Sequence, residues 1–173
     1  MWDDLVRLKN KGLVSKIGFS LDFPREIDEL KKMKIKPDLI QIPYNIFDQR
    51  FADKFPALKD DGVEIHARSA FLQGLLFKKP EELNPRFAAI RSKLVSLNSI
   101  AAKAGVAVSA LCLCFGILNP LIDRVIIGVD NIRNLKENLA AVAYAGDLQP
   151  LQSELLSLRE DEERIILPFR WNS

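Results

Sequence analysis

Gln41-Ile42-Pro43-Tyr44-Asn45 is one of two stretches that say most about this chain, and the other is Arg68-Ser69-Ala70-Phe71-Leu72-Gln73-Gly74-Leu75-Leu76. In each stretch an apolar run ends in small and polar residues. This pattern is typical of a buried strand that runs out into a loop facing a ligand. The same pattern recurs at residues 16–20 and 125–131. These four junctions predict four strands with ligand-facing loops at their ends.

Helical patterns separate the expected strands. Pro24, for example, opens a segment in which Ile27, Leu30 and Met33 share one face at i, i+3 spacing. Alternating strands and helices indicate parallel pairing with right-handed crossovers, which is the α/β class. The expected strands are residues 16–20, 38–42, 63–67 and 124–127, and the expected helices cover residues 5–8, 24–33, 49–59, 85–100, 106–118 and 132–139.

Length and charge narrow the possible classes of protein. A chain of 173 residues with no long linker predicts one domain, residues 1–173. It fits half of a (β/α)₈ barrel, about 125 residues, plus helical insertions, but not a complete barrel of about 250. The net charge of +2 is spread along the chain, so no nucleic-acid partner is expected. The amino-terminal segment is charged, and the longest apolar window, residues 106–117, is too short to cross a bilayer.

The two cysteines, Cys112 and Cys114, lie in an apolar run. At a spacing of two they point to different sides of a helix, so neither a disulfide between them nor a metal site is expected. We interpret them as small buried residues of a protein that works in the reducing cytoplasm.

The order of the four junctions resembles the second half of an aldo-keto reductase, a (β/α)₈ barrel that binds a nicotinamide cofactor at its C-terminal face. The resemblance runs from Trp2 to Trp171, and its most specific string, Phe-Leu-Gln-Gly-Leu-Leu, is similar to a bacterial subgroup. It implies a parallel (β/α) barrel fragment of four βα units with extra helices. The family's catalytic Asp, Tyr, Lys and His belong to the first four units. The resemblance therefore implies that the catalytic N-terminal half is absent and that this chain has no catalytic residue.

The resemblance also implies weak binding of NADP or NAD. Ser20 and Gln41 match positions whose side chains bind the nicotinamide carboxamide, and a hydroxyl and an amide suit that group. Leu21 stands where the family usually has an Asn, so one polar contact is missing. The alternatives are that Ser20 caps a turn and that Gln41 is tied to the main chain.

Arg68 holds the position of an aromatic ring that stacks on the nicotinamide in the family. A guanidinium can also stack, but its charge disfavours the oxidised, cationic ring. The alternatives are that Arg68 pairs with a carboxylate or phosphate, or that it is structural. The residues that match the loop beside the cofactor pyrophosphate are Ser69, Phe71, Gln73 and Gly74, where main-chain N–H groups can bind phosphate oxygens.

Residues 128–138 resemble the family's adenosine-binding loop and the helix after it. The matching positions are Gly128, Asp130, Asn134, Glu137 and Asn138. Asp130 is unfavourable beside a 2′-phosphate but can accept a hydrogen bond from a free 2′-hydroxyl, although Arg133 and Lys136 are near enough to bind a phosphate. Alternatively, Asp130 and Asn131 only cap the helix.

Three functions remain open at this point. The first is the cofactor-binding half of an NAD(P)H-dependent reductase, whose intact parent transfers hydride to a small carbonyl substrate. The second is a non-catalytic module that binds a nucleotide or assembles with a partner. The third is another reaction that uses Arg68, Glu64 or His66, although we expect His66 to be structural. We expect a homo-oligomer that buries a Val/Ile-rich inner face of the sheet. The alternative is a monomer in which residues 85–118 fold back over that face.

Overall fold

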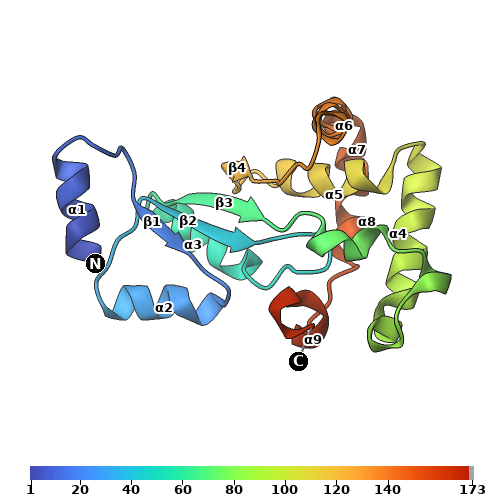
Figure 1. Ribbon diagram of the computed structural model, residues 1–173, viewed down its shortest axis with the longest axis horizontal. Coiled ribbons are helices and arrows are strands. Elements are labelled where there is room, and N and C mark those ends of the chain that lie inside the picture. The colour runs from blue at the N-terminus through green and yellow to red at the C-terminus, as the bar shows by residue number, and fades with distance from the viewer. Residues whose placement is uncertain (172–173) are drawn as a thin grey trace.

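Four parallel strands form one sheet in the order β1-β2-β3-β4 in the computed structural model, which describes residues 1–171 (Figure 1). The strands are β1 (Gly18–Ser20), β2 (Leu39–Pro43), β3 (Glu64–Arg68) and β4 (Arg124–Val125). They lie where the β-branched runs predict them. The sheet is open at β1 and β4, as expected for part of a (β/α) barrel rather than a closed one.

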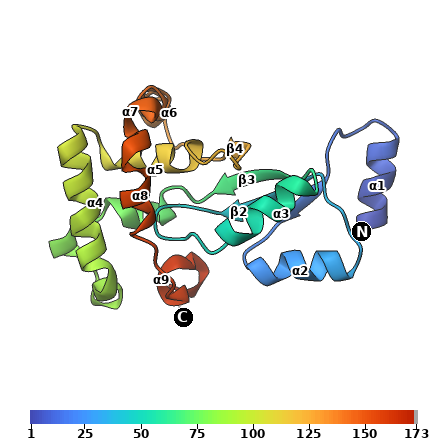
Figure 2. The same ribbon diagram turned by 180° about the vertical axis from the view of Figure 1, so that it is seen from behind.

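Helices connect the strands and extend beyond them (Figures 1 and 2). Pro24 opens α2, and the Glu26 carboxylate accepts the N–H groups of Asp22 and Phe23 at 2.7 Å. The α-helices are α1 (Trp2–Asn10), α2 (Pro24–Lys32), α3 (Phe55–Asp60), α4 (Arg91–Ala104), α5 (Val108–Ile117), α6 (Ile132–Val142), α7 (Ala145–Leu148), α8 (Gln152–Leu156) and α9 (Glu163–Ile166). Short 3₁₀ turns cover Ala52–Lys54, Leu72–Phe77, Pro80–Glu82, Pro85–Ile90, Gln149–Leu151 and Pro168–Arg170.

The two faces of the sheet differ from the expectation. Ile40, Ile42 and Ile65 are 0% exposed and belong to the core. The strand register places Gln41 and His66 on the opposite face, where both side chains remain partly exposed. The prediction of a Val/Ile-rich open face was therefore wrong, because the period of two sends the isoleucines toward the core and the polar residues to the open side.

The segment after β2 also differs from the expectation. The helix expected over residues 49–59 begins only at Phe55, after a 3₁₀ turn. Before it, the chain is a buried loop in which Gln49 is 4% exposed and donates from Nε2 to the main-chain oxygens of Ile46 (2.7 Å) and Leu156 (3.1 Å). Polar side chains that bind main-chain groups in this way compete with helix formation.

Two aspartates hold the amino ends of the strands in the same way. The Asp38 carboxylate accepts the Ile17 N–H at 2.9 Å, and the Asp123 carboxylate accepts the Ile65 N–H at 2.7 Å. Each also pairs with a lysine, Lys9 and Lys59 respectively. Both arrangements lower the pKa of the carboxyl group. For Asp38 the hydrogen bond from the Lys9 ammonium is the main cause, and for Asp123 desolvation raises the pKa but is outweighed by the hydrogen bonds from Lys59 and the Ile65 N–H together with nearby positive charge.

Within residues 1–171, the structure has neither a disulfide or metal site at the cysteines nor a single helix that could cross a membrane. Cys112 and Cys114 are each 1% exposed and free, and within residues 1–171 no group of His, Cys, Asp or Glu side chains could hold a metal ion. In the same part of the chain, no single helix is long and apolar enough to cross a bilayer. The helical segments Pro85–Ala104 and Val108–Ile117 meet both requirements, length and apolar composition, only as a pair, and that pair is bent by 91°.

Candidate functional site

A cleft of about 850 Å³ lies on the side of the sheet where β2 and β3 end, between the loop after β3 and the segment from β4 into α6. Because the carboxyl ends of parallel strands meet at one edge of a sheet, loops from distant parts of the chain come together there. The cleft is lined by eleven of the twelve residues that the sequence singled out: Gln41, Arg68, Ser69, Phe71, Gln73, Gly74, Gly128, Asp130, Asn134, Glu137 and Asn138.

The twelfth residue, Ser20, is exposed and does not line the cleft. It pairs with Gln41 in the β1–β2 register, so the two share the open face. Neither side chain makes a hydrogen bond within residues 1–171, so Ser20 does not cap a turn and Gln41 is not tied to the main chain there. The Gln41 amide thus presents an acceptor and two donors to the cleft.

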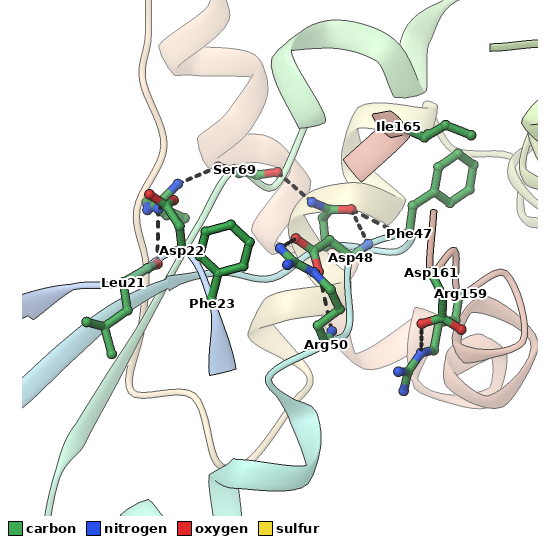
Figure 3. A network of polar contacts seen from close by, with 12 residues as sticks. Leu21, Asp22, Phe23, Phe47, Asp48, Arg50, Ser69, Arg159, Asp161 and Ile165 are labelled. Atoms are coloured by element: carbon green, nitrogen blue, oxygen red, sulfur yellow. Dashed lines mark hydrogen bonds and ion pairs between the residues drawn. The ribbon is translucent and has the colours of Figure 1, made fainter. Parts of the chain in front are cut away.

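Arg68 reaches from the end of β3 to Leu21 and Asp22 in the loop after β1, and Figure 3 labels these two partners. Its Nη2 donates to the main-chain oxygen of Leu21 at 3.1 Å and pairs with the Asp22 carboxylate, and its Nη1 donates to Ser69 Oγ at 3.3 Å. Of the alternatives that the sequence left open, pairing with a carboxylate is the one observed. The Nε of Arg68 is buried and has no acceptor within residues 1–171. An unsatisfied buried donor costs about 1–3 kcal/mol, which an acceptor on a ligand would recover.

The loop after β3 has a strained backbone. Ser69, Leu72 and Gln73 have φ values of 63°, 44° and 52°, and Gly74 follows at 80°. Residues other than Gly rarely adopt this left-handed backbone region, and those that do gather at ligand sites. The main-chain N–H groups of Ala70 and Phe71 make no hydrogen bond within residues 1–171. The loop can therefore present free N–H groups to an anion.

A buried network that was not expected from the sequence holds this loop in place. Asn45 donates from Nδ2 to the main-chain oxygen of Ser69 at 3.1 Å, and its Oδ1 accepts the N–H groups of Phe47 (3.0 Å) and Asp48 (2.9 Å). Asp48, 0% exposed, binds the Arg50 guanidinium through two contacts of 2.8 Å (Figure 3). The sequence contains one sign of this network, which is a group of polar residues soon after a strand in an otherwise apolar segment.

At the other end of the cleft, the Asn131 side chain caps α6 by accepting the Asn134 N–H at 2.9 Å. The capping alternative therefore applies to Asn131. Asp130 is exposed, and its carboxylate has no partner within residues 1–171. Arg133 is occupied by Glu137, with Nε 2.8 Å from Oε1. This end of the cleft therefore offers a free carboxylate, while one of its two nearby cations is already paired.

No tyrosine, lysine or histidine lines the cleft as far as residue 171. Tyr44 is 2% exposed between the rings of Phe55 and Phe115, and burial raises the pKa of its hydroxyl group. His66 lies on the open face of the sheet with Nε2 3.2 Å from the Glu64 carboxylate. The cleft can therefore bind and orient a polar ligand, but none of these three residue types is there to donate a proton near neutral pH.

Comparison with known proteins gives consistent matches. The model of the Aldo/keto reductase family matches residues 1–151. L-galactose dehydrogenase from Arabidopsis thaliana is 26% identical over 167 residues, which are 93% of this chain and 49% of that protein. This chain thus spans about half the length of the curated relative that it matches.

Solved structures show the same fold. The aldo-keto reductase AKR11C1 from Bacillus halodurans superposes with a TM-score of 0.70 in its apo form at 22% identity, over 91% of this chain and 56% of that one. Its holo form gives 0.65 at 20% identity, over 91% and 55%. The thermostable aldo-keto reductase Tm1743, in complex with the inhibitor epalrestat, gives 0.64 at 21% identity, over 89% and 52%.

Proposed function

The chain belongs to the aldo/keto reductase family, and we propose that it is the cofactor-binding half of an NAD(P)H-dependent carbonyl reductase of the cytoplasm. Members of this family are generally NAD(P)H-dependent oxidoreductases. The observation that carries the proposal is the cleft, which gathers eleven predicted cofactor-binding residues from three strand ends and one helix. Its volume of about 850 Å³ is in the range usual for ligand sites, roughly 300–1,000 Å³.

The free polar groups of the cleft suit the parts of a nicotinamide dinucleotide. The unpaired amide of Gln41 can bind the carboxamide, and the free N–H groups of Ala70 and Phe71 can bind the pyrophosphate. The buried Nε of Arg68, which has no acceptor within residues 1–171, favours a ligand acceptor between the carboxamide and the pyrophosphate. When bound, the reduced cofactor supplies the hydride for a small carbonyl substrate.

Reduction of a carbonyl also needs a proton donor, and neither tyrosine within residues 1–171 is a suitable one. Tyr44 is buried, its hydroxyl accepts a hydrogen bond from Asn119 Nδ2 at 3.1 Å, and desolvation raises its pKa. The other tyrosine, Tyr144, lies between α6 and α7 outside the cleft. We therefore propose that the acid belongs to a complementary half-barrel and that this chain alone has no carbonyl reductase activity.

Cofactor choice follows from the charges at the α6 end. Asp130 is a free carboxylate, and Arg133 is paired with Glu137. A 2′-phosphate would face the negative charge of Asp130, whereas a 2′-hydroxyl could donate to it. We propose a preference for NAD(H) over NADP(H).

Isothermal titration with NADH and NADPH tests the proposed cleft. Weak binding, with a dissociation constant of about 10 μM or higher, is expected because part of the rim is missing. Gln41→Leu should weaken binding about tenfold, whereas Glu64→Gln, on the same face but outside the cleft, should leave it unchanged. Absence of binding, or equal effects of the two changes, would contradict the proposal.

A turnover assay tests the missing acid separately. No consumption of NADH or NADPH with a panel of aldehydes is expected. Steady consumption that is abolished by a change at any residue of this chain would refute the claim that the catalytic acid lies elsewhere.

The alternative function is a non-catalytic assembly module, and one observation favours it. Ile132, Leu135, Leu139 and Val142 form a stripe on α6 at spacings of 3, 4 and 3, and their exposed fractions are 73%, 42%, 65% and 45%. We propose that the expected homo-oligomer forms through this stripe rather than through the polar face of the sheet. Light scattering over a concentration series tests it, and a concentration-independent mass of 19.6 kDa would rule it out.

A further inference from the structure

A second hollow, of about 440 Å³, lies near the opposite end of the strands from the cleft. Its walls come from α2, α3 and the start of β2, with Ile27, Leu30, Ile40 and Leu58 forming an apolar floor. Lys34 and Lys36, in the connection between α2 and β2, stand at its rim. None of its lining residues lines the cleft.

The charges at the rim are unbalanced. The hollow is bordered by three lysines and one carboxylate, and that carboxylate, Asp61, already pairs with Lys31 at 3.2 Å. Lys34 and Lys36 are exposed and make no ion pair or hydrogen bond through their side chains within residues 1–171. Two free ammonium groups therefore flank an apolar hollow.

The backbone fixes one of these lysines in an unusual conformation. Lys34 has a φ of 57°, a region where Gly is the default residue. Its N–H donates to the Lys31 oxygen at 3.0 Å, and the Ile35 N–H donates to the Leu30 oxygen at 3.0 Å, so the turn that ends α2 is fully hydrogen-bonded. A Lys at a position that favours Gly is a backbone outlier, and it places an ammonium group on a rigid turn at the rim.

We propose that this hollow is a binding site for an amphipathic monocarboxylate, in which an unbranched alkyl chain occupies the floor and the carboxylate lies between Lys34 and Lys36. The apolar floor disfavours a wholly polar anion, because polar groups placed against Ile27, Leu30, Ile40 and Leu58 would lose their hydration without gaining partners. The two unpaired ammonium groups favour a carboxylate over a neutral alcohol of the same length. The site is independent of the proposed cofactor cleft.

Isothermal titration of the whole chain with decanoate tests the proposal. Binding is expected, about fourfold weaker for each methylene removed from the chain, and at least about fivefold weaker for decanol. Lys34→Gly and Lys36→Gln should each weaken decanoate binding about threefold or more. The Gly variant suits the backbone of residue 34, so loss of binding there would not come from misfolding. Lys32→Gln, in α2 but outside the hollow, is the matched control and should have no effect.

The proposal is overturned by three results: no binding of decanoate up to about 1 mM, equal affinity for decanol, or equal effects of the Lys34, Lys36 and Lys32 changes. Amide chemical shifts give a second readout. Shifts at Ile35 and Leu58 support the site, whereas shifts confined to the cleft place the fatty acid elsewhere and refute it.

Discussion

The side chain of Asn45 donates a hydrogen bond to the main-chain oxygen of Ser69 at 3.1 Å, and this contact joins the loops that follow β2 and β3. Asn45 is 1% exposed, and Ser69 has a φ of 63°. A strained residue on the rim of the cleft is thus held by a buried amide from the loop after the neighbouring strand. Such support positions a ligand-binding loop without touching the ligand.

Replacing Asn45 with Ala should lower the free energy of unfolding by about 2–4 kcal/mol, because it removes three hydrogen bonds and leaves the N–H groups of Phe47 and Asp48 buried without acceptors. Urea unfolding measures the effect. Asn45→Asp is the matched control: it keeps the acceptor for both N–H groups but cannot donate to Ser69. If Ala costs less than about 0.5 kcal/mol, the network does not hold the loops.

Gly18 illustrates a different constraint, the close approach of β1 to β2. A Cβ added at Gly18 would lie 1.9 Å from the main-chain oxygen of Leu39. Gly18→Ala should therefore separate the strands and cost at least about 3 kcal/mol in unfolding free energy. Gly146→Ala is the control, since nothing lies within 4 Å of the added atom and α7 should gain up to about 1 kcal/mol. Similar stabilities for the two variants would show that β1 can move without penalty.

The strands and most of the cleft follow from the sequence for one physical reason. Runs such as Leu39–Pro43 have the composition of buried strands, and parallel strands bring their carboxyl ends to one edge. Residues at those ends, such as Gln41 and Arg68, therefore line one cleft even though they are far apart in the chain. The local sequence pattern was enough to predict which residues lie close together wherever the topology of the sheet alone decides this.

Other features depend on contacts that local pattern does not encode. The partner of Asn45 is 24 residues away, and Gln49 binds the Leu156 oxygen 107 residues away, so the polar residues after β2 indicate a network but not its partners or the late start of α3. The period of two along β2 identifies two faces but not which one the helices cover, and this led to the wrong open face. Ser20 ends β1, the edge strand, and lies outside the cleft formed around β3 and β4.

Acid should destabilise the chain through Asp38 and Asp123. Hydrogen bonds to the ionised carboxylates lower both pKa values below the ordinary 3.8. A group whose pKa is lower in the folded chain contributes stability that is complete above the unfolded pKa and is lost as the pH falls through the folded one. Below about pH 4, therefore, the unfolding free energy should fall as these groups take up protons.

The Asp38→Asn and Asp123→Asn variants measure this contribution. Each should be about 1 kcal/mol less stable than the wild type at pH 7, and the difference should shrink toward zero near about pH 2. Asp60→Asn is the control, because the exposed Asp60 side chain has no partner within residues 1–171. A difference that stays constant with pH would mean that packing of the side chain, rather than its charge, is responsible.

Asp130 should set the choice between the two cofactors in the proposed cleft. It is a free carboxylate, and Arg133 is held by Glu137 at 2.8 Å. A 2′-phosphate therefore meets a negative charge, and Lys136, near it in sequence, has no ion-pair partner within residues 1–171. The wild type should bind NADH about tenfold more tightly than NADPH, and Asp130→Ser should remove most of that difference by strengthening NADPH binding. Glu137→Gln should act in the same direction, because it frees Arg133. Asp147→Ser, in α7 outside the cleft, should change neither affinity.

Isothermal titration measures the affinity of each variant for NADH and NADPH without the need for turnover. Tighter binding of NADPH by the wild type would refute the role of Asp130, while leaving the cleft itself supported by Gln41→Leu.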